Sequence, residues 1–127
     1  ELFRLSIATQ ENFGNLMLKS KLLSQKGQAA EADALSKKAL TIADEVQLNQ
    51  YGYDLINRKD VKGAIKIFQT NVKRYPNSWN VYDSLGEAYD LDGNKKEAIA
   101  NYKTALAKAP EEQQSRITGI IKALETK

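Results

Sequence analysis

A repeat of 34 residues is the feature that most limits what this chain can fold into. When residues 79–112 are aligned with residues 45–78, glycine and proline recur in register, as Gly52/Gly86 and Pro76/Pro110. The same register pairs further identical or apolar residues: Lys62/Lys96, Ala64/Ala98, Ile65/Ile99, Thr70/Thr104, Leu48/Tyr82, Phe68/Tyr102 and Val72/Leu106. Periods of roughly 20–50 residues are typical of repeat proteins, in which each repeat is one supersecondary unit. The sequence therefore predicts a repeat architecture.

Each repeat is predicted to be a pair of antiparallel helices. In the last repeat, Ser78 is placed to cap a first helix from about Trp79 to Leu91, and a second helix is expected from Lys95 to Lys108. The run Asp92-Gly93-Asn94 separates them, because glycine tolerates the left-handed conformation that ends helices. Pro110 cannot continue the second helix.

Small residues inside these helices indicate a close contact between them. Gly86 and Ala98 are expected to let the two helix backbones approach each other, while Tyr89 and Tyr102 fill the volume between turns. Arg58-Lys59-Asp60 occupies the equivalent of the Asp92-Gly93-Asn94 turn one repeat earlier. The two repeats are thus predicted to form the same hairpin.

A third, more degenerate repeat is predicted upstream, at an offset of 32 residues. Leu16, Leu23 and Ala32 align with Leu48, Leu55 and Ala64, and Ala39 and Leu40 supply the later small and large apolar positions. Gly27 stands at the turn between the two helices. Lys19 and Ser36 interrupt the apolar pattern, and Asp44 replaces the closing proline.

The last repeat reads Tyr82-x2-Leu85-Gly86-x2-Tyr89, then Ala98-x3-Tyr102-x2-Ala105, and closes on Pro110. The middle repeat reads Leu48-x2-Tyr51-Gly52-x2-Leu55, then Ala64-x3-Phe68, and closes on Pro76, with Asn71 in place of a small apolar residue. This pattern resembles the tetratricopeptide repeat (TPR) family. The run from Pro76 to Tyr89 also looks like C-terminal repeats of bacterial multidomain proteins. The resemblance implies an all-α fold, a right-handed superhelical array of helix hairpins (an α-solenoid).

The chain is expected to form a single TPR-like domain over residues 1–127. Residues 1–10, with Leu2, Phe3, Leu5 and Ile7, are interpreted as an N-terminal extension, followed by repeats at 11–44, 45–78 and 79–112. Residues 113–127 are expected to form a capping helix, since Ile117, Ile120, Ile121 and Leu124 make an apolar stripe at helical spacing. A cap covers the end of a repeat array.

Composition excludes most catalytic chemistry. The 127 residues include no Cys and no His, so thiolate nucleophiles, Ser-His-Asp triads and His or Cys metal sites are excluded. The chain is therefore predicted not to be an enzyme and to need no cofactor or metal. A net charge of +3 without a basic, aromatic-rich face argues against nucleic acid, and no apolar run suits membrane insertion. Because the chain begins with Glu1 and has no leader-like segment, it is interpreted as a processed protein or an excised piece.

In proteins that resemble this one, the first helices of the repeats line a concave groove that receives a peptide or protein segment. The corresponding residues, called the groove positions below, are Met17, Lys21, Asn49, Tyr53, Ile56, Asn57, Asn80, Asp83, Glu87 and Asp90. Spacing supports part of this set independently. Asp83, Glu87 and Asp90 share one helix face, opposite the predicted core stripe of Tyr82, Leu85 and Tyr89.

Three carboxylates and several amides suggest what such a groove would bind. The carboxylates favour a ligand with Lys or Arg, and Asn side chains can bond a peptide backbone as donor and acceptor. The alternative is that the carboxylates only keep an exposed face solvated, as most charged runs do. A glycosidase pair at Asp83 and Glu87, a hard-metal site at the three carboxylates and a clamp for acidic chaperone tails all lack supporting residues.

Two functions follow from the sequence. The first is a non-enzymatic scaffold for protein–protein interaction that binds a peptide or protein segment. The second is an accessory or oligomerisation domain of a larger bacterial enzyme or envelope protein, which predicts an apolar patch outside the groove positions. The partner's identity, the oligomeric state and the choice between a cytoplasmic and a periplasmic location are left open.

Overall fold

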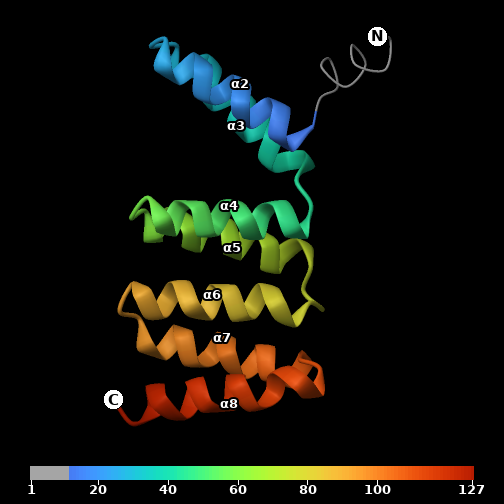
Figure 1. The fold of residues 1–127 in the computed structure, drawn as a ribbon, viewed down its shortest axis with the longest axis vertical. Coiled ribbons are helices and arrows are strands. Elements are labelled where there is room, and N and C mark those ends of the chain that lie inside the picture. The colour runs from blue at the N-terminus through green and yellow to red at the C-terminus, as the bar shows by residue number, and fades with distance from the viewer. Residues whose placement is uncertain (1–11) are drawn as a thin grey trace. The chain divides into compact units, whose positions relative to one another are not determined.

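The computed structural model describes residues 12–127, and all regular structure in that range is helical (Figure 1). Its helices are α2 (Phe13–Gln25), α3 (Ala29–Ile42), α4 (Glu45–Asn57), α5 (Val61–Arg74), α6 (Trp79–Leu91), α7 (Lys95–Lys108) and α8 (Glu111–Glu125). The expected N-terminal extension, with Leu2, Phe3, Leu5 and Ile7, lies outside the described residues. The prediction of an all-α chain is confirmed for this range.

The chain divides into two compact units, and each is described by itself. Unit 1 ends at Gln47 and holds α2, α3 and the first turn of α4. Unit 2 runs from Leu48 to Lys127 and holds the rest of α4 together with α5 to α8, which lie one above the next in chain order (Figure 1). The single-domain organisation and the superhelical arrangement stay predictions.

Helix lengths repeat along the chain. The first helices of the three predicted repeats, α2, α4 and α6, each have 13 residues. The second helices, α3, α5 and α7, each have 14. The boundaries expected for Trp79–Leu91 and Lys95–Lys108 are those observed. This alternation is what a helical repeat requires.

The same turn closes every hairpin. Gly27, Lys59 and Gly93 have φ values of 81°, 67° and 82°, in the left-handed region. The residue that follows each of them donates a backbone hydrogen bond five residues back: Gln28 to Leu23, Asp60 to Leu55 and Asn94 to Tyr89, at 2.8–2.9 Å. This is the Schellman arrangement, which satisfies carbonyl groups left over at a helix end. The glycine predicted to break the helices at residue 93 does so.

The residue after each turn also begins the next helix. Asp60 accepts a hydrogen bond from the backbone N–H of Gly63 at 2.9 Å, and Asn94 accepts one from Glu97 at 3.2 Å. These side chains satisfy amide groups that have no partner inside the helix. Gln28 occupies the equivalent place without a side-chain cap. The α2–α3 hairpin thus departs from the pattern at its cap as well as in its sequence.

Between repeats, the caps are less uniform. Asp44 accepts from the Gln47 N–H at 2.8 Å while Gln47 accepts from the Asp44 N–H at 3.0 Å, which is a reciprocal capping box. Ser78 occupies the predicted N-cap position of α6, although its side chain makes no capping hydrogen bond. The Tyr82 hydroxyl instead donates to the Pro76 carbonyl at 2.9 Å and ties α6 to the preceding turn.

We expect Lys59→Gly to raise the free energy of unfolding by about 0.5–1 kcal/mol. The left-handed conformation costs a residue with a Cβ about 1–2 kcal/mol, and the larger chain entropy of glycine offsets part of the gain. Chemical denaturation followed by circular dichroism measures the change. Lys66→Gly, inside α5, is the matched control and should destabilise by about 1 kcal/mol. Destabilisation by both variants would show that the turn does not strain Lys59.

Unit 2 has two clusters of buried residues. One joins α7 to α8 and contains Ala98, Tyr102, Ala105, Ala109, Ile117, Ile121 and Leu124. The other joins α5 to α6 and contains Ala64, Ile65, Phe68, Leu85 and Ala88. Burial of Ile117, Ile121 and Leu124 confirms the predicted apolar stripe of the last helix, which begins at Glu111 directly after Pro110.

Glycine in the first helix of a hairpin makes room for an aromatic ring in the second. A Cβ at Gly86 would lie 3.0–3.1 Å from ring atoms of Tyr102, and a Cβ at Gly52 would clash with the ring of Phe68 more severely. The sequence had suggested contact between two backbones, whereas the glycines in fact accommodate a buried side chain. Both rings are almost fully enclosed, with Phe68 at 0% and Tyr102 at 4% exposure.

The first hairpin replaces this pair by two serines. Ser20 aligns with Gly52 and Gly86, and its hydroxyl donates to the Ala32 carbonyl at 2.6 Å. Ser36 aligns with Phe68 and Tyr102 and lies against the sulfur of Met17 at 3.9 Å. On α2, Ser20 is larger than the glycine of the other two hairpins, and on α3, Ser36 is smaller than their aromatic residue. This exchange explains why Ser36 interrupts the apolar pattern without preventing the hairpin.

Candidate functional site

The groove positions of α4 and α6 fall into two exposure classes. Asn49, Tyr53, Ile56, Asn80 and Asp83 are half-buried, while Asn57, Glu87 and Asp90 are exposed. Ile56 packs against the α5–α6 core, so it contributes to stability as well as to the surface. All eight lie in unit 2, so the structure shows how they are arranged relative to one another.

A hydrogen-bonded network joins three of these residues across α4 and α6. The Tyr53 hydroxyl donates to Glu87 Oε1 at 2.8 Å and lies 3.2 Å from Ser84 Oγ. Ser84 Oγ in turn donates to Asn49 Oδ1 at 2.6 Å. Groove positions from two successive repeats are therefore connected through Ser84, which is not one of the predicted groove positions. We call Asn49, Tyr53, Ser84 and Glu87 the polar network.

Ser84 was missed because its sequence signal is weak. It stands next to Leu85 in the core stripe and has no polar counterpart of similar size in the preceding repeat, where Gln50 takes its place. In the structure Ser84 is 1% exposed. A buried hydroxyl needs a hydrogen-bond partner, and the amide of Asn49 is that partner.

The aromatic ring of Tyr53 is held by the core while its hydroxyl faces the polar network. The ring packs edge-to-face on Phe68, with centroids 5.2 Å apart and an interplanar angle of 62°. Burial, aided by the nearby charge of Glu87, raises the pKa of Tyr53 to about 12. Tyr53 therefore stays protonated at neutral pH and remains a hydrogen-bond donor to Glu87.

Asp83 differs from the exposed carboxylate that the sequence suggested. Its side chain is only 14% exposed, and its Oδ1 lies 3.1 Å from Nη2 of Arg116, on α8. The spacing of Asp83, Glu87 and Asp90 put them on one face but gave no indication that a residue of the last helix would reach them. Of the three carboxylates, Asp83 is thus already paired with a cation of the same chain.

The three carboxylates lie close enough together to act on one buried hydroxyl. Burial raises the pKa of Tyr102 well above its ordinary value, and the charges of Asp83, Glu87 and Asp90 each raise it further.

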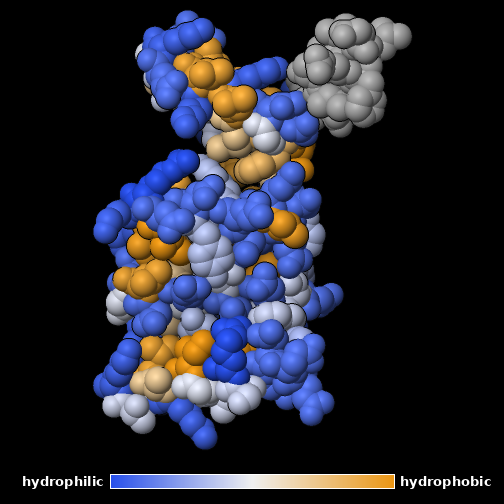
Figure 2. Space-filling model, viewed as in Figure 1, coloured by the Kyte–Doolittle hydropathy of each residue, from blue (hydrophilic) through white to orange (hydrophobic). Residues whose placement is uncertain are grey.

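The two remaining groove positions belong to unit 1. Met17 is half-buried, and the Ser36 hydroxyl lies at hydrogen-bond distance from its sulfur, 3.9 Å. Lys21 is exposed. On the same helix Leu18 and Leu22 are 57% and 48% exposed, one turn apart, and apolar side chains are visible at the surface of this hairpin (Figure 2).

Among residues 12–127, no three His, Cys, Asp or Glu side chains are grouped so that they could hold a metal ion. None of the helices described in that range combines the length and apolar character needed to cross a bilayer.

Comparison with known proteins assigns no family to the chain. No protein-family model matches the sequence. No curated protein matches it either. The resemblance to tetratricopeptide repeats therefore depends on the residues of the two best repeats, and it stays a prediction.

Proposed function

We propose that this chain is a non-enzymatic interaction scaffold of the tetratricopeptide type, a superhelical array that binds a peptide or protein segment along its groove positions. The observation that carries the proposal is the polar network, in which Tyr53 and Asn49 of α4 are joined to Ser84 and Glu87 of α6. It makes groove positions of two successive repeats part of one connected surface.

A connected network suits binding because its side chains are ordered before the ligand arrives. Side chains that a ligand must immobilise each cost roughly 0.5–1.5 kcal/mol of affinity. The ring of Tyr53 is fixed by Phe68, and its hydroxyl by Glu87. The amide of Asn49 carries donors besides the acceptor used by Ser84, so it suits the backbone of an extended peptide.

Charge favours a basic ligand. Glu87 and Asp90 are exposed one turn apart on α6, while the mostly buried Asp83 is paired with Arg116. Arg and Lys side chains of a ligand would find these carboxylates next to amides that hold the peptide backbone. A peptide with several Arg residues in a Gly/Ser background is a suitable first probe.

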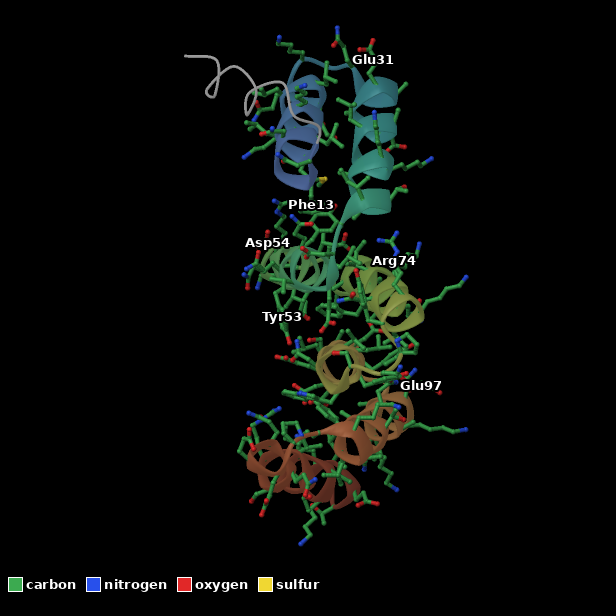
Figure 3. The ribbon with its side chains drawn as sticks, turned by 90° about the vertical axis from the view of Figure 1, so that its right-hand side faces the viewer. Phe13, Glu31, Tyr53, Asp54, Arg74 and Glu97 are labelled. Atoms are coloured by element: carbon green, nitrogen blue, oxygen red, sulfur yellow. The ribbon has the colours of Figure 1, made fainter. Side chains whose placement is uncertain are left out.

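Glu87→Gln combined with Asp90→Asn is expected to weaken binding of the fluorescently labelled Arg peptide about tenfold, as loss of roughly 1.4 kcal/mol of charge interaction requires. Fluorescence anisotropy at fixed ionic strength measures the affinity. Glu97→Gln is the control, because Glu97 is an exposed carboxylate on the side of unit 2 opposite Tyr53 (Figure 3). Equal losses in both variants, or none in either, would contradict binding at the groove positions.

The second function has an observation of its own. Leu18 and Leu22 form an exposed apolar pair on α2, in unit 1. Such a pair favours an accessory role, in which the domain packs on a neighbouring domain of a larger bacterial protein or associates with itself. Light scattering over a range of concentrations distinguishes self-association from the monomer that a peptide scaffold needs.

A further inference from the structure

The ion pair between Arg116 and Asp83 occupies one of the groove positions with a cation from the chain itself. Arg116 extends from α8, and its Nε donates to Gln113 Oε1 at 3.0 Å, one turn earlier on the same helix. Its Nη2 then lies 3.1 Å from Asp83 Oδ1 on α6. The Arg116 side chain is 46% exposed and borders solvent, whereas the Asp83 side chain is only 14% exposed.

Arg116 and Asp83 form an ion pair without a well-directed hydrogen bond to Asp83 Oδ1. Arg and a carboxylate usually form two parallel hydrogen bonds. Here Asp83 Oδ1 is buried and lies 3.1 Å from Nη2 of Arg116, yet it accepts no well-directed hydrogen bond from any described residue. A desolvated carboxylate oxygen with only an off-axis ion contact gains from a cation that can reach it more directly. A ligand guanidinium is such a cation.

We propose that Arg116 sets the charge specificity of the groove by competing with the ligand for Asp83. A basic ligand gains its contact with Asp83 only when Arg116 swings away, so Arg116 lowers the affinity for isolated cations and favours ligands basic enough to displace it. This inference rests on the proposed function, since it concerns the same surface. It adds Arg116 of α8, which is not one of the groove positions.

Arg116→Gln is expected to tighten binding of the labelled Arg peptide about three- to fivefold. That factor corresponds to the strength of a partly exposed ion pair, which sets the fraction of molecules with Asp83 open. A peptide with citrulline in place of Arg keeps the shape without the charge, and its affinity should not change. Lys122→Gln is the matched control: it removes the same charge from exposed α8 surface. It should leave both affinities within about a factor of 1.5.

A thermodynamic cycle with Asp83→Asn tests the mechanism. If Arg116 acts through Asp83, then Arg116→Gln has no effect on affinity in the Asp83→Asn background. Equal gains for Arg116→Gln and Lys122→Gln would mean that only net charge matters and would overturn the inference.

Binding measurements on the other variants separate this inference from the proposed function. The double variant Glu87→Gln, Asp90→Asn could weaken binding of the Arg peptide while Arg116→Gln leaves the affinity unchanged. In that case Arg116 does not compete for Asp83, and the scaffold proposal stands. If neither the wild-type chain nor the Arg116→Gln variant prefers the Arg peptide to the citrulline peptide, both proposals fail. Circular dichroism of each variant establishes that it is folded.

Discussion

Replacing Phe68 with alanine is expected to lower the free energy of unfolding by about 3–5 kcal/mol, the usual cost of removing a large buried ring. Phe68 is 0% exposed, belongs to the core cluster that joins α5 to α6, and also contacts Gly52 and Tyr53 of α4. Its loss therefore leaves a cavity bordered by three helices. Urea denaturation of the full chain, followed by circular dichroism, measures the change.

Leu91→Ala provides the comparison for Phe68→Ala. Leu91 is also a large apolar residue, but it is 55% exposed at the end of α6. We expect its removal to cost less than about 1 kcal/mol, because little apolar area returns to water. Similar losses for the two variants would mean that Phe68 does not form the centre of this core.

Gly52→Ala is expected to destabilise the chain by about 1–3 kcal/mol, although alanine is the better helix former by about 1 kcal/mol. An added Cβ would overlap ring atoms of Phe68, which is enclosed and cannot move aside cheaply. Gly119→Ala is the matched control, since a Cβ there meets nothing within 4 Å and α8 continues on both sides. That variant should be more stable than the wild type by about 0.5–1 kcal/mol.

Combining the two substitutions tests the cause of the Gly52 effect. In the Phe68→Ala background the ring is gone, so Gly52→Ala should no longer destabilise and should show the gain expected of a helix. Gly86→Ala should cost less than Gly52→Ala, because the ring of Tyr102 stands farther from the added atom, at 3.0–3.1 Å. Additive losses at Gly52 and Phe68 would show that the two residues do not share this contact.

Local signals made the helices predictable. Gly93 and Pro110 act through the conformation of their own backbone or the residues next to them, so the C-terminal ends of α6 and α7 follow from the sequence alone. Lys59 shows the limit of such reasoning. Its left-handed conformation could be inferred only by alignment with Gly93, because lysine has no intrinsic preference for it.

The candidate site was predictable in part. Helical spacing assigned Asp83, Glu87 and Asp90 to one face. The ring of Tyr53, also a groove position, packs on Phe68 of its own hairpin. The contacts of these residues could not be inferred. Tyr53 reaches Ser84 and Glu87, 31 and 34 residues away, and Arg116 reaches Asp83 from another helix.

The sequence by itself determined where α6 and α7 begin and end, that the last helix carries an apolar stripe, and that two hairpins of unit 2 share one pattern. These properties depend on residues within a few positions of each other. Only the tertiary structure decided that Gly52 and Gly86 accommodate rings, that Ser84 completes the polar network and that Arg116 pairs with Asp83. The reason is physical: such contacts depend on distances between helices, which side-chain packing sets and which no periodicity in the chain records.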